Sequence, residues 1–154
     1  MKADIINPFL KSVSNVLSTM AMLEVSPGTP SIKSDTISKG DVSGIIGMTT
    51  KTVNGSMAIT FPDVVAFDIV NRMLGDKVTE IDATVTDLVG ELTNMIVGGA
   101  KGLLEENGYD IGMATPVVVT GKNHEIIHKA VGKNILMPFK SDAGTFYVEV
   151  CFEG

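Results

Sequence analysis

The sequence predicts an α+β fold in which two long helices pack on an antiparallel or mixed sheet. Apolar residues recur at helical spacing in two segments, about 8–23 and 85–106, and strand-like segments follow each of them. Because consecutive strands are joined as hairpins, a doubly wound parallel sheet is disfavoured. The chain has 154 residues, of which 44% are hydrophobic, so we expect a single domain spanning residues 1–154 with a sizeable core.

The first half of the chain reads as one helix followed by two strands. We expect the helix to begin at Pro8, which loses no needed hydrogen bond at a first helical position, and to end before the turn at 26–30. Strands are expected at 42–50 and 56–61, with the Asn54-Gly55 pair favouring a tight hairpin between them. One face of the helix is predicted to be buried through Phe9, Val13, Val16, Leu17 and Met20.

The second half repeats this order after a short helix. That helix spans about 62–74, with Pro62 opening it and Gly75 closing it. A polar connection at 76–83 leads into the long helix at 85–106. Three strands are predicted after the long helix, at 116–120, 134–139 and 145–152, with a turn at 140–144. A Thr-Pro pair follows each long helix, and a hairpin comes later in each half, which suggests an internal duplication of an α-β-β unit.

Composition excludes several classes of function. The formal net charge is −6 and the 12 basic residues are scattered, which argues against nucleic-acid binding. No apolar stretch approaches the length of a membrane span, and the N-terminus does not resemble a signal peptide. The single cysteine, Cys151, has no partner within the chain and is interpreted as a buried strand residue. We therefore expect a cytoplasmic protein.

The long helix has a polar stripe opposite an apolar arc. At about 100° per residue, six residues fall close together on the stripe: Asp87, Glu91, Asn94, Gly98, Lys101 and Glu105. The arc opposite comprises Leu88, Leu92, Met95, Ile96, Leu103 and Leu104. A solvated helix face would explain such a stripe.

Glycines within the long helix need a separate explanation. Gly90, Gly98, Gly99 and Gly102 each cost roughly 0.5–1 kcal/mol relative to alanine. Gly99 lies on the apolar side, where close helix packing explains it. Gly98 lies on the polar stripe and Gly90 and Gly102 flank it, which leaves a flat surface suited to docking a partner protein.

The spacing Asp87-x3-Glu91-x2-Asn94, followed after 21 residues by Pro116, resembles the signature of the CheC/CheX/FliY phosphatase family. The opening segment INPFLKSVSNVLSTM is also similar to the first helix of this family. The resemblance implies a CheC/CheX-like fold and an aspartyl-phosphate phosphatase of chemotaxis or two-component signalling. Its substrate would be a phosphorylated, CheY-like response-regulator receiver domain.

The resemblance also assigns roles to residues. Asn94 would orient the attacking water, and Glu91 would pair with a lysine of the receiver. Asp87 and Pro116 would support the motif, Asp87 by favouring the helix start. Gly90, Gly98 and Lys101 would form the docking surface. Mg²⁺ would come from the receiver, so no metal site or cofactor of its own is expected.

The first helix carries an incomplete copy of the motif. Superposed on the long helix, it places Ser12 opposite Glu91 and Asn15 opposite Asn94. The carboxylate is missing, and Asn15 is interpreted as a solvated polar residue. Members of the family with one site form homodimers, so the resemblance implies a homodimer here.

Two other functions compete with this one. A non-enzymatic module, docking receiver domains or serving at the flagellar switch, would use the same surface without hydrolysis. Residues 124–128 also match the metalloprotease pattern His-Glu-x-x-His, with Glu149 as a possible third ligand. This segment is not predicted to be helical, and in a strand His124 and His128 would lie about 13 Å apart, too far for one zinc ion. A chance match is the better interpretation.

Overall fold

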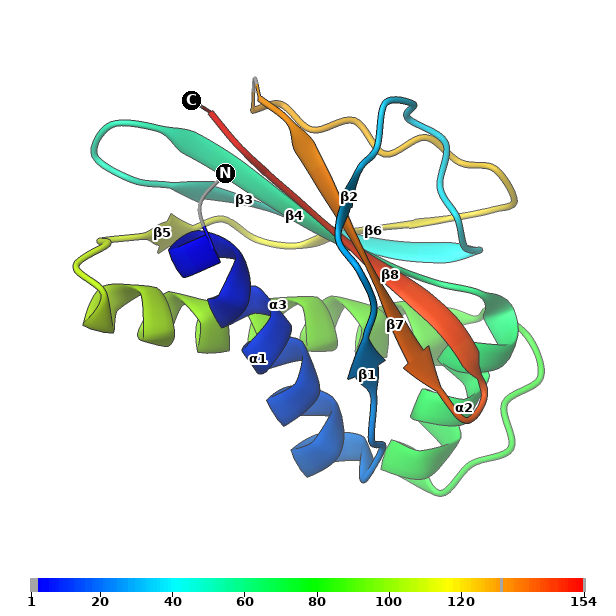
Figure 1. The fold of residues 1–154 in the computed structure, drawn as a ribbon. Helices are drawn as coiled ribbons and strands as arrows, with labels where there is room; N and C mark the ends of the chain where they lie inside the picture. The colour runs from blue at the N-terminus through cyan, green and yellow to red at the C-terminus, as the bar shows by residue number, and fades with distance from the viewer. Residues whose placement is uncertain (1–2, 131, 154) are drawn as a thin grey trace.

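A computed structural model describes residues 3–130 and 132–153. The helices are α1 (Ala3–Ala21), α2 (Asp63–Leu74) and α3 (Ala83–Glu106). The strands are β1 (Ser26–Pro27), β2 (Ser31–Ile32), β3 (Val42–Thr49), β4 (Asn54–Phe61), β5 (Gly112–Met113), β6 (Val117–Thr120), β7 (Asn134–Ser141) and β8 (Gly144–Phe152). All three helices lie on one face of a single sheet (Figure 1).

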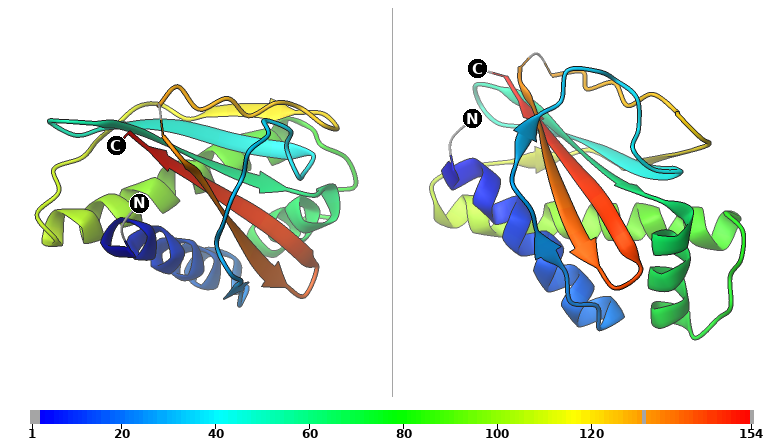
Figure 2. Two further views of the ribbon diagram at one scale, coloured as in Figure 1. Left: turned by 45° about the horizontal axis from the view of Figure 1, so that its top comes forward. Right: turned by 45° about the vertical axis from the view of Figure 1, so that its right-hand side comes forward.

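The sheet is antiparallel throughout the described residues. Its strands follow the order β1-β7-β8-β4-β3-β5, while β2 also pairs with β7 and β6 also pairs with β3. Figure 2 shows α3 running beneath the strands at one side of the sheet and α1 beneath those at the other. The predicted α+β class with an antiparallel sheet is confirmed.

The strand pairing reveals the internal duplication. The hairpins β3–β4 and β7–β8 meet at the centre of the sheet, where β4 pairs with β8. The short strands that precede each hairpin pair with the hairpin of the other half: β1 and β2 join β7, whereas β5 and β6 join β3. The two α-β-β units thus exchange their short strands, and α2 lies between them in the chain.

Helix α1 differs from its predicted bounds at both ends. It begins at Ala3, so Pro8 lies inside the helix and has no N–H to offer the carbonyl of Asp4. The buried side chain of Ile6 explains why the chain is helical before the proline. The helix ends at Ala21, where Met22 takes a left-handed conformation with φ 50° and the N–H of Leu23 reaches the Leu17 carbonyl at 3.1 Å.

The predicted Asn54-Gly55 turn is wrong. Both residues belong to β4, and the chain reverses at 50–53, where the N–H of Thr50 donates to the carbonyl of Val53 at 2.8 Å. A Cβ at position 55 would lie 2.5 Å from the ring of Phe152 on β8. Glycine is therefore required at position 55 by close packing within the sheet rather than by a turn.

The remaining predicted elements are present with small shifts. Helix α2 follows Pro62 and ends at Gly75, which has the expected left-handed conformation with φ 70°. The core lies between the helices and the sheet, and it includes the fully buried rings of Phe9, Phe61 and Phe146. No helix within the described ranges is long and apolar enough to cross a bilayer.

Candidate active site on helix α3

The start of α3 is fixed by Asp82 rather than by Asp87. The Asp82 carboxylate accepts a hydrogen bond from the N–H of Val85 at 3.2 Å, and the helix begins at Ala83. Asp87 is the fifth helical residue and lies beyond the first turn, where the helix dipole acts on charges. The predicted role of Asp87 in starting the helix is therefore wrong, and its carboxylate is exposed.

The rotation of α3 on the sheet is set at Thr93. Its side chain is fully buried and donates to the Val89 carbonyl at 2.7 Å. On the facing strand β3, a Cβ at position 44 would lie 1.8 Å from the Thr93 hydroxyl oxygen, so only Gly44 allows this approach. We did not predict this contact, although β3 contains two glycines, Gly44 and Gly47.

The buried face of α3 is turned relative to the predicted arc. Leu92, Ile96 and Leu104 are buried as predicted, whereas Leu88, Met95 and Leu103 are only half-buried. The buried residues are Val85, Val89, Leu92, Thr93, Ile96, Val97, Ala100 and Leu104. Helical geometry puts Asn94 about 100° and Glu91 about 160° around the helix from Thr93. Both side chains therefore lie at the surface.

Helix α1 packs on the other side of α3. The Ser12 hydroxyl donates to the Ile96 carbonyl at 2.6 Å, and a Cβ at position 99 would lie 2.4 Å from that hydroxyl. The predicted helix-packing role of Gly99 is therefore confirmed. Ser12, which the sequence alignment sets against Glu91, is buried in this contact, whereas Asn15 is exposed as predicted.

The polar stripe is an exposed ridge along α3. Asp87, Glu91, Asn94 and Gly98 are all exposed. Within residues 3–130 and 132–153, neither the Glu91 carboxylate nor the Asn94 amide has a hydrogen-bond or ion-pair partner. Both groups are therefore free to bind a partner molecule.

Lys101 lies further along the same ridge, where it is half-buried. Its ammonium is paired with the Glu105 carboxylate one turn on. The hydrogen bond to Glu105 raises the pKa of Lys101. The charge of Lys101 is thus balanced within the helix.

At two positions on or beside the ridge, packing within the protein does not require a glycine. A Cβ at Gly98 or Gly102 would have no neighbouring atom within 4 Å. At Gly90 a Cβ would lie 3.4 Å from the Val118 side chain, so strand β6 borders the ridge there. Pro116 is half-buried and immediately precedes β6, which places the last residue of the motif at the start of this bordering strand.

The two histidines of the His-Glu-x-x-His pattern lie on the opposite face of the sheet. His124 contacts the Ser43 hydroxyl at 2.6 Å, and His128 contacts both Ser56 and, at 3.1 Å, the Glu149 carboxylate. The segment that carries them is not helical, so the two rings bind different strands. No group of three potential metal ligands with suitable geometry is found among the described residues.

Cys151 lies on this same face of β8. It is buried, and its Sγ lies 3.5 Å from the Ala130 carbonyl oxygen. Burial raises the pKa of this thiol. The interpretation of Cys151 as a buried strand residue is confirmed.

The exposed amide and carboxylate limit the chemistry that α3 can perform alone. An amide both donates and accepts hydrogen bonds, so it can hold a water molecule in a defined orientation. A carboxylate can pair with a cation. Both side chains are exposed on the helix surface, so they are accessible to a group carried by a partner molecule.

Sequence comparison identifies the family to which this surface belongs. The sequence profile of the family described as "Chemotaxis phosphatase CheX" matches residues 42–140, which include α3 and most of the sheet. The chain belongs to the CheX family. The predicted relationship is thereby confirmed.

Relatives of this CheX-family chain are similar to it in sequence or in structure over nearly its whole length. The CheY-P phosphatase CheX of Thermotoga maritima is 28% identical over 139 residues, covering 90% of this chain and 88% of the relative. A CheC-like superfamily protein from Shewanella sp. PV-4 has a crystal structure with 57% identity and a TM-score of 0.94, covering all of both chains.

A third relative was crystallised in a complex. A chain of the CheX–CheY–BeF3–Mg²⁺ structure from Borrelia burgdorferi is 26% identical, covers 99% of this chain and 100% of its own, and has a TM-score of 0.83. The fold described above is thus found in CheX proteins, including one bound to CheY.

Proposed function

We propose that this CheX-family protein hydrolyses the aspartyl phosphate of a CheY-like receiver domain, and that Asn94 and Glu91 are its catalytic residues. The observation that carries the assignment is the placement of these two side chains. They are exposed, they lie one turn apart on α3, and neither has a partner within the described residues. The family match and the Borrelia complex with CheY support the receiver as substrate.

The reaction needs little from the phosphatase beyond positioning. In an aspartyl phosphate, water attacks phosphorus, the bond from phosphorus to the carboxylate oxygen breaks, and aspartate and inorganic phosphate are released. Holding the water in line with the leaving oxygen is the main requirement. The Asn94 amide suits this role because it can donate one hydrogen bond to the water and accept another.

Glu91 complements a basic partner group. Its carboxylate lies one turn before Asn94 and would pair with a lysine of the receiver, which fixes how deeply Asn94 enters the pocket. The Mg²⁺ ion would be held by the receiver. The presence of Mg²⁺ in the Borrelia complex supports this assignment.

A dephosphorylation assay tests the proposal. Loss of label from a phosphorylated receiver is measured with Mg²⁺ and each variant. We expect Asn94→Ala to lower turnover by about 100-fold or more while leaving most of the binding, since it removes the group that orients water. Glu91→Ala should weaken both binding and turnover.

The control for this assay is Asn15→Ala, which removes an exposed asparagine of α1 and should leave the rate unchanged. Wild-type turnover by Asn94→Ala would refute the site. If wild type binds the receiver but does not accelerate dephosphorylation, the alternative of a non-enzymatic docking module is correct.

We also propose that the protein is a cytoplasmic homodimer. One complete motif per chain supports this state, because the sequence alignment of the two units sets Ser12 against Glu91, and Ser12 carries no carboxylate and is used in packing. The strands at the sheet edges have backbone groups available for pairing between subunits. Sedimentation velocity should give twice the 16.3 kDa chain mass, and a monomer at micromolar concentration would contradict the dimer.

A further inference from the structure

Several apolar side chains of the three helices remain partly or fully exposed. Met20 near the end of α1 is 45% exposed, although the spacing of α1 predicted it to be buried. Leu74 at the end of α2 is 50% exposed, and Leu88 and Met95 of α3 are half-buried. We refer to Met20, Leu74, Leu88 and Met95 as the apolar patch.

Contacts between the helices relate the positions of these residues. Helices α1 and α3 are antiparallel, because Asp4 accepts from the Tyr109 hydroxyl at 2.9 Å and Ser12 donates to the Ile96 carbonyl. Met20 lies eight residues after Ser12, and Leu88 lies eight residues before Ile96. Met20 and Leu88 therefore lie on the same side of the Ser12–Ile96 contact, each about two turns along its own helix.

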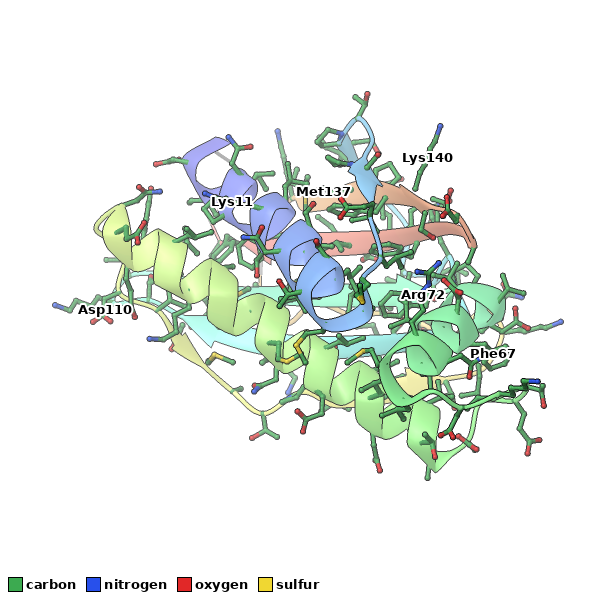
Figure 3. The ribbon with its side chains drawn as sticks, turned by 90° about the horizontal axis from the view of Figure 1, so that it is seen from below. Lys11, Phe67, Arg72, Asp110, Met137 and Lys140 are labelled. Carbon is green, nitrogen blue, oxygen red and sulfur yellow. The ribbon has the colours of Figure 1, made fainter. Side chains whose placement is uncertain are left out.

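The end of α2 reaches the same place. The Arg72 guanidinium donates to the Met22 carbonyl at 3.3 Å, which joins the last turn of α2 to the end of α1. Figure 3 shows the end of α1 lying between α3 and the end of α2, with several sulfur atoms, in yellow, near this junction. The patch therefore spans three helices.

The patch is continuous with the catalytic ridge. Measured around α3 from Thr93, Asn94 lies at about 100°, Glu91 at about 160°, Met95 at about 200° and Leu88 at about 220°. Glu91 thus has Asn94 on one side and the apolar patch on the other. A molecule that covers Glu91 and Asn94 on this face will also reach Met95 and Leu88.

We propose that the apolar patch is the hydrophobic centre of the receiver-docking surface. This inference rests on the proposed function and adds to it the surface that supplies affinity. An exposed ion pair contributes little binding energy, whereas specific interfaces depend on a few buried apolar or aromatic anchors. Methionine side chains adapt their shape to a partner surface at low cost.

A receiver domain fits this surface better than a second copy of the chain. A second copy seated on the patch would also cover Glu91, and the catalytic side chains could not enter another protein's pocket. Glu91 and Asp87 give the ridge beside the patch a negative charge that is not balanced within the helix, which favours a partner with a basic rim.

The test measures receiver affinity and turnover for Met20→Gln. The Kd is measured for a receiver carrying BeF3 and Mg²⁺, and KM and kcat are measured for the phosphorylated receiver. We expect Kd and KM to rise about tenfold and kcat to stay within about twofold, because an apolar anchor is lost and the reacting groups are unchanged.

The matched control is Ile127→Gln, which alters an exposed isoleucine on the opposite face and should leave all three constants unchanged. Leu74→Gln changes a patch residue on another helix. If Met20→Gln fails to fold, the Kd and KM of Leu74→Gln test the inference instead. The inference is overturned if these patch variants bind the receiver as tightly as Ile127→Gln does. It is also overturned if they change only the oligomeric state, which would make the patch a contact between copies.

The proposed function fails by a different result. If the Asn94→Ala variant turns over the phosphorylated receiver as fast as wild type does, the catalytic assignment is wrong. This holds whatever effect Met20→Gln has on the Kd for the receiver. Conversely, loss of turnover in Asn94→Ala together with an unchanged Kd in Met20→Gln would overturn only the role of the patch.

Discussion

Thr93 of α3 packs directly against Gly44 of β3. The contact is so close that a Cβ at position 44 would lie 1.8 Å from the Thr93 hydroxyl oxygen. The two residues have no exposed surface that could meet a partner. Their contact nevertheless determines the site, because it fixes the rotation of α3 at the residue next to Asn94. A different rotation would turn the Asn94 amide or the Glu91 carboxylate toward the sheet or toward α1.

This contact predicts a large effect for Gly44→Ala. The added methyl group cannot be accommodated unless α3 moves, so we expect the free energy of unfolding to fall by about 1–3 kcal/mol and turnover to fall with it. Urea unfolding and the dephosphorylation assay measure the two effects. Gly47→Ala is the control in the same strand, since its Cβ would meet only Ala114 at 3.9 Å. Equal stability of the two variants would contradict the role of the contact.

The exposed glycine at position 98 predicts opposite effects on stability and binding. Because a Cβ there has open space, Gly98→Ala should raise the free energy of unfolding by about 0.5–1 kcal/mol. The same methyl group stands one turn beyond Asn94 on the ridge and should weaken receiver binding. Thermal unfolding and a binding titration measure the two quantities.

Gly102→Ala is the matched control for Gly98→Ala. Its surroundings are equally open, so it should give the same gain in stability. It lies a further turn from Asn94, so its effect on receiver binding should be smaller. A Gly98→Ala variant that binds the receiver as tightly as wild type would show that this glycine is not part of the docking surface.

On the opposite face of the sheet, Glu149 is the centre of a buried polar cluster. Its carboxylate accepts from Lys33 at 2.9 Å, from Asn134 at 2.7 Å and from His128 at 3.1 Å. Burial by itself raises the pKa of Glu149, but the hydrogen bonds from His128, Asn134 and Lys33 outweigh it and hold the pKa below its ordinary value. The ionised carboxylate thus ties the segments carrying Lys33 and His128 to the sheet.

The lowered pKa of Glu149 predicts how stability depends on pH. The folded protein holds this carboxylate ionised at pH values where the unfolded chain binds a proton. Its contribution is therefore complete above the unfolded pKa of about 4.3 and is lost as pH falls through the lower, folded pKa. Urea midpoints measured from pH 7 to pH 3 should show this loss.

Glu149→Gln should reduce the dependence of the urea midpoint on pH between pH 7 and pH 3. It should also lower the free energy of unfolding at pH 7 by about 3–5 kcal/mol, because Lys33 stays buried without its counter-charge. The control Glu106→Gln changes an exposed carboxylate and should keep the slope of wild type. A Glu149→Gln slope equal to that of wild type would show that Glu149 does not govern the acid response.

Several features of the fold could be predicted from the sequence, because local periodicity and chain breakers specify them. The spacing of Phe9, Val13 and Leu17 gave the buried face of α1, and Pro62 and Gly75 gave the ends of α2. Predictions failed where a distant residue decided the local structure. Gly55 looked like a turn residue but is required by the Phe152 ring, which is 97 positions away in the sequence.

The sequence by itself determined the helices, the antiparallel hairpins and the relative position of Glu91 and Asn94, because helical spacing alone puts these two on one side of α3. Only the tertiary structure decided how far α3 is turned on the sheet, which leaves Leu88, Met95 and Leu103 half-buried, since that depends on the packing of Thr93 on Gly44 and of Ser12 on Gly99. It also decided that Met20 remains exposed, although its helical spacing predicts burial. Such outcomes depend on contacts between elements far apart in the chain, and no pattern within one element contains them.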